Sequence, residues 1–209
     1  MQVECVRWHE ERYCRLTASN FGCVIQRKSE FHKLALELLS PKNLSNVPAI
    51  KWERDHELEA FKYKQGLDSL HPNMMLSKSG VVIGDIPYLA ASPDGVLIDE
   101  SGEVRGMIKI KCPYSAAKLT VNEACEQLDN IYLSKVEEKF VLQANHLYYF
   151  QIQGTMALVG GAKFCDFVVW TPKSFEIISI NFERSTWEVE MLPKLTAFYT
   201  TYLLPAILY

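Results

Sequence analysis

Three charged side chains in the middle of the chain have the types and spacing for phosphodiester chemistry. Asp94 lies in the turn Ser92-Pro93-Asp94-Gly95, and Lys109 and Lys111 follow in a β-rich run that ends at Cys112-Pro113. Alternate residues of a strand share a face, so a hairpin can bring Asp94 beside both lysines. This grouping suits metal-assisted hydrolysis, in which a carboxylate holds the ion, the ion lowers the pKa of bound water, and a lysine orients that water.

The surrounding pattern predicts the elements that position these residues. Short apolar runs bounded by turn residues predict strands at 81–83, 88–91, 96–98, 107–112, 164–170 and 175–182, with 96–98 and 107–112 forming a hairpin. Helical spacing is found at 21–25, 34–39, 50–65, 136–158 and 183–209, the last bent or broken near Pro193 and Pro205. This order predicts an α/β (α+β) fold with a central mixed β-sheet flanked by helices.

The composition is that of an ordinary globular protein. The chain has 209 residues, 48% hydrophobic and 22% charged, without repeats or linker-like tracts, which predicts one domain over residues 1–209. Lys and Arg number 22 against 25 for Asp and Glu, so a nucleic-acid site must be a local patch. Residues 103–118 supply one, with four basic side chains against Glu103 alone.

Cysteine usage and hydropathy predict an intracellular, soluble protein of the host cytoplasm or nucleus. The six cysteines include no CxxC pair, and no histidine lies at zinc-finger spacing, so reduced thiols are expected. The first 15 residues contain no apolar run of signal-peptide type, and the apolar stretch 195–209 is too short to span a bilayer. No membrane partner is therefore expected.

A set of motifs in one order resembles the lambda-exonuclease-like, or YqaJ-type viral recombinase, family of PD-(D/E)xK nucleases. The resemblance implies a restriction-endonuclease-like core, and it is carried by the order of the motifs more than by any one of them. They are Arg12 to Ser19, Trp52 to Ala60, Ser92-Pro93-Asp94-Gly95, Lys111-Cys112-Pro113 and Tyr149-Phe150-Gln151-Ile152-Gln153.

The resemblance implies a role for each matching residue. Asp94 corresponds to the central ligand of Mg²⁺ or Mn²⁺, Glu57 to a further acid at the metal, and Lys111 to the partner that orients water. Gln153 corresponds to a glutamine that lines the active site from the long helix.

A second group corresponds to the residues that hold a terminal 5′-phosphate in this family: Arg12, Ser19 and Ser92. An arginine fork with two hydroxyl groups beside a helix start is a sound phosphate site on physical grounds as well.

Lys109 is the main departure from the family pattern, which has Glu or Asp two residues before the catalytic lysine. The exchange changes the local charge by two units. At about 5 Å and an effective dielectric of about 20, an ammonium and a divalent ion repel by on the order of 6 kcal/mol, so metal binding should weaken. A natural inactive relative, a variant disabled to trap DNA, and compensation by Glu57, Glu103 or another acid all fit. Glu53 also stands where relatives often have glycine.

Taken singly, these features have ordinary structural interpretations. Ser-Pro-Asp-Gly is a good β-turn, alternating lysines can form a solvated strand face, and Glu57 sits in an acidic helix segment. Two functional hypotheses therefore remain, besides the possibility of a globular domain unrelated to nucleic acid. One is a metal-dependent 5′→3′ exonuclease acting on linear double-stranded DNA in recombination or DNA-end processing. The other is an inactive module that holds DNA ends or recruits a single-strand annealing protein. The resemblance also implies a homotrimeric ring.

Overall fold

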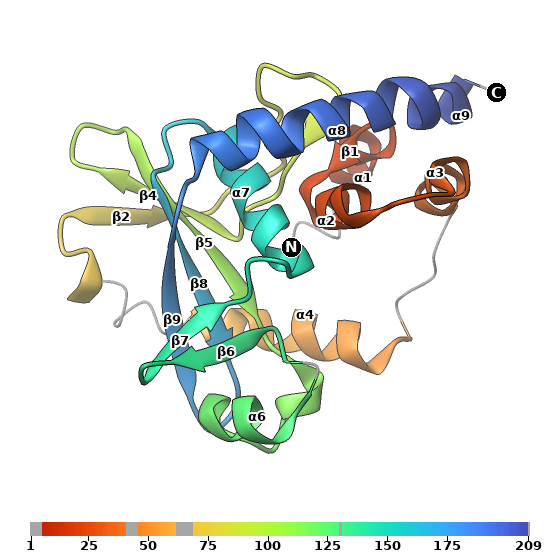
Figure 1. Cartoon of the computed structure of the whole chain (residues 1–209). Coiled ribbons are helices and arrows are strands. Elements are labelled where there is room, and N and C mark those ends of the chain that lie inside the picture. Colours follow the sequence, from red (N-terminus) through yellow and green to blue (C-terminus); the bar gives the residue numbers. More distant parts are fainter. Residues whose placement is uncertain (1–5, 41–45, 62–68, 130, 209) are drawn as a thin grey trace.

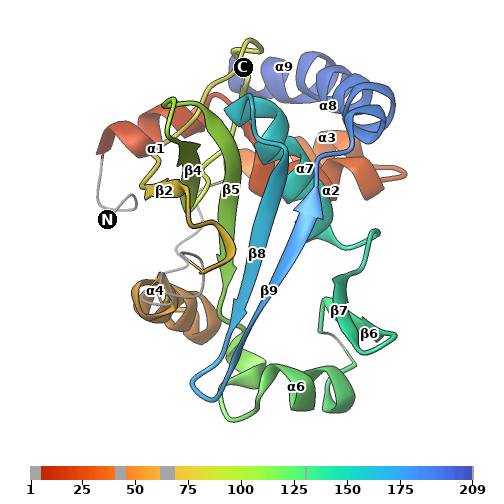
Figure 2. The same cartoon turned by 90° about the vertical axis from the view of Figure 1, so that its left-hand side faces the viewer.

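A five-stranded mixed sheet forms the centre of the computed structural model, which describes residues 6–40, 46–61, 69–129 and 131–208 (Figure 1). Its strand order is β2-β4-β5-β8-β9, and all neighbours are antiparallel except the parallel pair β5 and β8 (Figure 2). The predicted mixed sheet is thereby confirmed. The strands are β2 (Met74–Ser77), β4 (Gly95–Asp99), β5 (Val104–Lys111), β8 (Phe164–Trp170) and β9 (Phe175–Asn181).

The β4–β5 hairpin follows the local sequence pattern closely. Its turn is closed by the Asp99 carboxylate, which accepts hydrogen bonds from the Ser101 and Glu103 amides at 2.9 and 3.1 Å. Hydrogen bonds from the Ser101 side chain, then from Arg105, lower the pKa of Asp99. Gly102 has φ +84°, a conformation that favours glycine. The predicted turn and its two strands are therefore confirmed.

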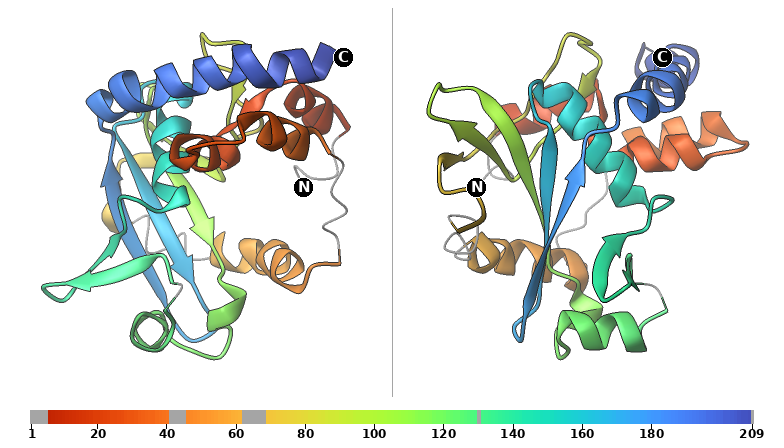
Figure 3. Two further views of the ribbon diagram at one scale, coloured as in Figure 1. Left: turned by 45° about the vertical axis from the view of Figure 1, so that its right-hand side comes forward. Right: turned by 60° about the vertical axis from the view of Figure 1, so that its left-hand side comes forward.

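Helices cover both faces of the sheet. Alternation along β5 sends Met107 to one side, toward α7, and Ile108 and Ile110 to the other, toward α4. The right-hand view of Figure 3 shows α4 and α7 on opposite sides of the sheet. The helices are α1 (Val6–Tyr13), α2 (Phe21–Gln26), α3 (Phe31–Leu39), α4 (Pro48–Phe61), α6 (Val121–Gln127), α7 (Leu147–Val159), α8 (Leu192–Phe198) and α9 (Leu204–Leu208).

A separate apolar cluster joins the N-terminal helices to α7 and to the C-terminal helical run. Phe21 and Leu195 are fully or almost fully buried there. A Cβ atom on Gly154 of α7 would lie 2.3 Å from the Phe21 ring, so only glycine permits this close approach of α2 and α7. The packing fixes the start of α2, next to which the predicted phosphate-site residue Ser19 lies.

The long helix predicted over residues 136–158 is wrong in its first part. Residues 133–142 form a hairpin of β6 (Leu133–Val136) and β7 (Lys139–Leu142), and Glu137 and Glu138 make its turn with φ +47° and +65°. Alternating apolar residues on β7 pack on the core at Phe140 and Leu142, which favours a strand. Helix α7 begins only after His146, whose Nδ1 accepts a hydrogen bond from the Tyr148 amide at 3.1 Å.

The helix predicted over 183–209 is confirmed over residues 184–208, and its two prolines are accommodated; residue 209 lies outside the described residues. A wide π-helical stretch precedes each proline-containing turn, at η4 (Thr186–Met191) and η5 (Tyr199–Leu203). Pro193 and Pro205 each follow such a stretch, where a missing amide donor costs least.

The remaining predictions of helices and strands are confirmed only in part. The strand expected at 81–83 is reduced to one bridge between Val82 and Ala91, whereas 88–91 contains β3 (Leu89–Ala90). The helix expected at 50–65 is α4, and the prediction for 62–65 lies outside the described residues. Helices α1 and α6 and strand β2 were not predicted. Within the described part, none of the helices has the length and apolar character needed to cross a membrane.

Candidate active site

The end of β5 and the residue before β4 form the centre of the candidate site. The β4–β5 ladder starts at Gly95 opposite Ile108, so the last residues of β5 extend past it. Asp94 fills this space. Its amide donates to the Ile108 carbonyl at 3.2 Å, and its Oδ2 accepts from the Ile110 amide at 2.6 Å. The backbone of β5 therefore fixes the position of the Asp94 carboxylate.

Lys109 holds the other oxygen of that carboxylate. Its Nζ lies 2.7 Å from Asp94 Oδ1, and the two side chains are only 13% and 9% exposed. An ion pair of this length with little access to water is strong and poorly screened by salt. Both oxygens of Asp94 are thus engaged by donors from β5.

Helix α4 brings two carboxylates to the same end of β5. Trp52 stacks on His56 with ring centroids 3.8 Å apart, and His56 in turn lies 5.4 Å from the ring of Trp170 on β8. This apolar stripe docks α4 on the sheet. Glu53 and Glu57 each follow a residue of the stripe and are themselves four residues apart, so they share the adjacent helix face.

Glu53 pairs with Lys111. Its Oε1 lies 2.5 Å from Lys111 Nζ, and the same ammonium lies 4.7 Å from the ring centre of Tyr148 on α7. Burial is the largest single effect and favours the neutral amine. The charge and hydrogen bond of Glu53, together with Tyr148 and Asp94, outweigh burial and raise the pKa of Lys111 above its ordinary value. Lys111 is therefore a permanent cation at neutral pH and can stabilise negative charge or orient a donor, but it cannot accept a proton.

Glu57 is the less stabilised carboxylate of this group. Burial raises its pKa, and the neighbouring charges of Asp94 and Glu53 raise it further, against the opposing effect of Lys109 and Lys111. The electrostatic influence of all four groups on Glu57 shows that α4, Asp94 and the end of β5 act as one charged cluster. We call these five residues the central cluster: Glu53, Glu57, Asp94, Lys109 and Lys111.

A second group of predicted residues lies beside the central cluster. Strand β1 (Leu16–Thr17) pairs in parallel with β3, with Thr17 opposite Ala90, so Ser19 and Ser92 both lie two residues beyond that pair. Arg12 Nη1 donates to Ser92 Oγ at 3.2 Å. Burial lowers the pKa of Arg12. We call Arg12, Ser19 and Ser92 the phosphate corner.

The phosphate corner adjoins the central cluster because Asp94 follows Ser92 by only two residues. The Ser19 hydroxyl lies 3.0 Å from that of Thr17, and Ser19 itself is exposed. A guanidinium and two hydroxyl groups at one place can bind the oxygens of a phosphate group. The geometry thus combines an anion site with a cluster of acids and lysines.

A scan against family models matches residues 7–162 to the YqaJ-like viral recombinase domain. The chain belongs to the YqaJ-like viral recombinase family. The match spans the phosphate corner, the central cluster and α7, so the family resemblance seen in the sequence motifs is confirmed.

Solved structures show the same fold. The alkaline exonuclease LHK-Exo from Laribacter hongkongensis matches with a TM-score of 0.69 at 21% identity, over 98% of this chain and 95% of that one. The structure of LHK-Exo in complex with dAMP matches with a TM-score of 0.68 at 20% identity, over the same shares of both chains. No match is found among curated proteins. Both structures therefore share the fold of this chain.

The central cluster of this YqaJ-like chain does not fit the divalent ion that the family resemblance implies. Among the described residues, no group of three or more His, Cys, Asp or Glu side chains is placed to hold a metal. Both oxygens of the predicted ligand Asp94 already accept hydrogen bonds, from the Ile110 amide and from Lys109. The raised pKa of the predicted ligand Glu57 makes it a weaker anionic ligand for a metal. An ammonium stands where a cation would bind.

Gln153 is bonded at the end of β9, and its role in lining the active site stays a prediction. Its side chain is fully buried, its Nε2 donates to the Asn181 carbonyl and its Oε1 accepts from the Glu183 amide, both at 2.9 Å. These bonds tie α7 to the end of β9. The amide therefore satisfies two backbone groups that would otherwise be buried without partners.

Two residues of the site were missed as functional residues. Glu53 was noticed only as a departure from the family pattern, although its spacing of four from Glu57 places both on one helix face. The contact of Tyr148 with Lys111 depends on how α7 packs against β5. Helical spacing could have revealed Glu53, whereas no local sequence signal reveals Tyr148.

Proposed function

We propose that this chain binds the 5′-phosphorylated ends of linear double-stranded DNA and that Lys109 withholds hydrolysis. The scaffold is that of a 5′→3′ exonuclease for recombination or DNA-end processing, and residues 1–209 act as one domain. The observation that carries the proposal is the 2.7 Å contact between Lys109 and Asp94, two side chains that are almost buried. The structural match over 98% of the chain supports the single domain.

The phosphate corner supports the binding half of the proposal. Arg12 is held by Ser92, and the pairing of β1 with β3 keeps Ser19 on the same side. A terminal 5′-phosphate bound there places the next linkage of the strand beside the central cluster, because Asp94 follows Ser92 in the same turn. Lys111, charged at neutral pH, then faces the backbone phosphates as a fixed cation.

The charge balance of the central cluster supports the proposal that Lys109 prevents hydrolysis. With Glu57 ionised, the three carboxylates and two ammonium groups of the central cluster carry a net charge of −1. Replacing Lys109 by glutamate changes this by two units, to −3. The same change frees one oxygen of Asp94 and adds an oxygen ligand, which is what hard cations such as Mg²⁺ prefer. A single side chain thus separates end binding from a site competent to hold a metal.

The decisive experiment compares the native chain with its Lys109→Glu variant on 5′-phosphorylated linear duplex DNA with Mg²⁺ and with Mn²⁺. The native chain is expected to bind these ends without digesting them. Lys109→Glu is expected to digest them at least about a hundredfold above background, because a bound divalent ion can supply several kcal/mol of transition-state stabilisation. Asp94→Ala in the Lys109→Glu background should abolish digestion.

The matched control is Lys163→Glu, the same charge change at an exposed lysine just before β8, at the far end of the sheet. It should leave both binding and inactivity unchanged. Digestion by the native chain at the rate of the variant contradicts the suppressive role of Lys109. A folded Lys109→Glu protein that stays inert with both ions contradicts the nuclease scaffold as a source of activity.

The family resemblance extends the proposal to assembly. We take the binding form to be a homotrimer that surrounds the DNA end and works beside a single-strand annealing protein. Sedimentation equilibrium measures the first point directly. A monomer at the concentrations at which DNA ends are bound rejects the trimer but leaves the end-binding proposal in place.

A further inference from the structure

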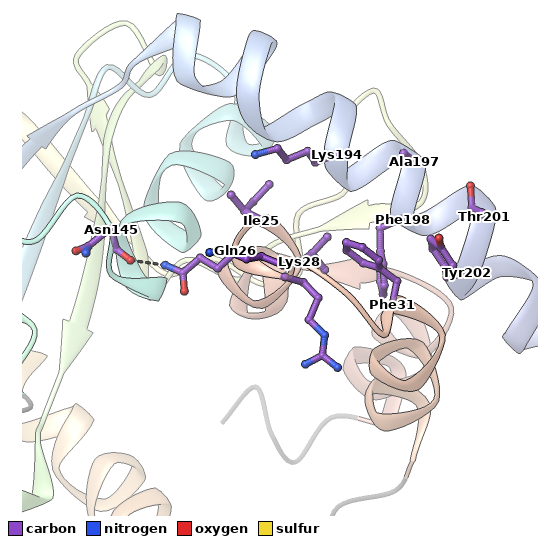
Figure 4. A pocket seen from close by; sticks show the side chains of 12 residues that line it. Ile25, Gln26, Lys28, Phe31, Asn145, Lys194, Ala197, Phe198, Thr201 and Tyr202 are labelled. Atoms are coloured by element: carbon purple, nitrogen blue, oxygen red, sulfur yellow. Dashed lines mark hydrogen bonds between the residues drawn. The ribbon is translucent and has the colours of Figure 1, made fainter.

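A large cavity far along the chain from the central cluster has no role in the proposed function. It has a volume of about 960 Å³ and lies between the end of α2, the start of α3, the residue Asn145 before α7 and the C-terminal helical run (Figure 4). Pockets for small ligands span about 300–1,000 Å³, so this cavity suits an extended ligand better than one small group.

The charge of the cavity is positive. Its lining includes Arg27, Lys28 and Lys194, and none of the 12 described lining residues is acidic. Arg27 is partly engaged, because it donates to the Ser29 carbonyl at 2.8 Å and lies 3.6 Å from Glu30. Lys28 and Lys194 are exposed, and the described part of the chain places no carboxylate within ion-pair distance of either. An anionic ligand is therefore favoured.

One wall of the cavity is aromatic. Phe31 and Tyr202 stack with ring centroids 5.4 Å apart and an interplanar angle of 23°, and Phe198 lies 6.3 Å from Phe31. Phe198 is buried and fixes the group, whereas Phe31 and Tyr202 are half-buried and present part of their surface to the cavity. A stack that is already ordered can be extended by a flat ring at little entropic cost.

The opposite end is polar. The Gln26 side chain donates to the Asn145 backbone carbonyl, and Figure 4 shows this pair at the end away from Phe31 and Tyr202, with Lys194 extending from α8 above it. Amide groups of this kind can meet the donor and acceptor edges of a nucleobase. Aromatic faces, cations and amides in one cavity are the combination that binds single-stranded nucleic acid.

We propose that this cavity binds a short segment of single-stranded DNA, with a base stacked on the Phe31–Tyr202 pair and phosphates near Lys28 and Lys194. The inference rests on the proposed function for its ligand, because a protein that holds DNA ends meets unpaired strands there. Inside a duplex both faces of each base are covered by its neighbours, so apart from the terminal pair only an unpaired segment can offer a base to the stack. An acidic peptide shares the charge but gains nothing specific from the stack.

The test is fluorescence anisotropy of the full-length chain with a 3′-labelled oligothymidine that carries a 5′-hydroxyl group, so that the phosphate corner contributes little. Lys28→Gln/Lys194→Gln is expected to weaken binding about tenfold and to reduce the salt slope by about 0.7 for each lysine. The control Lys163→Gln/Lys173→Gln alters two exposed lysines away from the cavity and should change neither quantity.

The aromatic wall is tested separately. Tyr202→Leu keeps an apolar side chain against the core but removes the ring, and it should weaken oligothymidine binding about 5- to 100-fold, the range for loss of one stacked base. Tyr202→Phe keeps the ring and should bind like the native chain. Equal binding by Tyr202→Leu and Tyr202→Phe, with both folded by thermal melting, overturns the stacking role.

The remaining outcomes separate this site from the proposed function. If hexaglutamate binds and is lost in Lys28→Gln/Lys194→Gln while oligothymidine binding is unchanged, the cavity is an acidic-peptide site and the inference fails. If the cavity variants keep oligothymidine affinity but Arg12→Ala loses preference for 5′-phosphorylated duplex, the proposed function stands without this site. If the cavity variants weaken oligothymidine binding while duplex ends show no 5′-phosphate preference, the cavity binds single-stranded DNA and the proposed function fails.

Discussion

The phosphate corner and the central cluster share one turn of the chain, yet they depend on the sequence in different ways. Pairing of β1 with β3 positions Ser19 and Ser92 of the phosphate corner, and Arg12 of α1 donates to Ser92. The central cluster depends on the side chain at one position, and there Lys109 departs from the pattern. Under the proposed function, binding of a DNA end and hydrolysis of its backbone are therefore separable, and a single substitution should affect one without the other.

The largest expected effect is a loss of stability when the ion pair of the central cluster is broken. Asp94→Ala leaves the Lys109 ammonium almost buried without its partner and removes the acceptor of the Ile110 amide. Losing one member of a buried ion pair costs roughly 3–5 kcal/mol, so urea denaturation should show a drop of this size in the free energy of unfolding. Asp94→Ala/Lys109→Met removes both charges and should recover most of it. A loss below about 1 kcal/mol in the single variant contradicts a structural ion pair.

The next effect addresses the phosphate corner. Arg12→Ala removes the guanidinium that we propose binds the terminal phosphate and that donates to Ser92. Hydrogen bonds to charged groups are worth about 1.5–3 kcal/mol. Preference for a 5′-phosphate over a 5′-hydroxyl duplex end should fall by about 10- to 100-fold in competition binding. Arg15→Ala is the matched control, because Arg15 is engaged by Glu11 and the Pro87 carbonyl. If both variants lose the preference equally, the corner does not recognise the phosphate.

A smaller effect tests the fit of the central cluster for a divalent ion. A ligand that binds only the folded state raises the free energy of unfolding with the logarithm of its concentration over Kd, by about 2.7 kcal/mol at a hundredfold excess. The native chain should melt at the same temperature with and without millimolar Mg²⁺, whereas Lys109→Glu should melt a few degrees higher with the ion. A Mg²⁺-dependent shift in the native chain shows that Lys109 does not keep the ion out.

The parts that could be predicted from the sequence are those set by neighbouring residues. The turn at Asp94, the β4–β5 hairpin and the facing of Lys109 and Lys111 follow from turn residues and from the alternation of a strand. The pairing of Asp94 with Lys109 follows from the same geometry once the hairpin forms.

The parts that could not be predicted depend on packing between distant segments. Glu53 reaches Lys111 only because Trp52 and His56 dock α4 on β8. Gln153 has the spacing of a site residue on its helix, but its side-chain nitrogen and oxygen both hydrogen-bond to backbone groups at the end of β9. The β6–β7 hairpin contains enough apolar residues at helical spacing to imitate the start of α7.

Glu57 supplies the smallest effect and a test of the electrostatics of the central cluster. Because burial and two neighbouring carboxylates raise its pKa, the folded state binds this proton more tightly than the unfolded state does. The stability linked to Glu57 is therefore fully present below the unfolded glutamate pKa of about 4.3 and is lost as pH rises through the higher folded pKa. Glu57→Gln should melt at a higher temperature than the native chain at pH 8, with the difference shrinking toward pH 4. Glu59→Gln, an exposed position on the same helix, should show little difference at either pH. A gain that grows toward acid contradicts this sign and means that Glu57 is stabilised as an anion, which is the state a metal ligand needs.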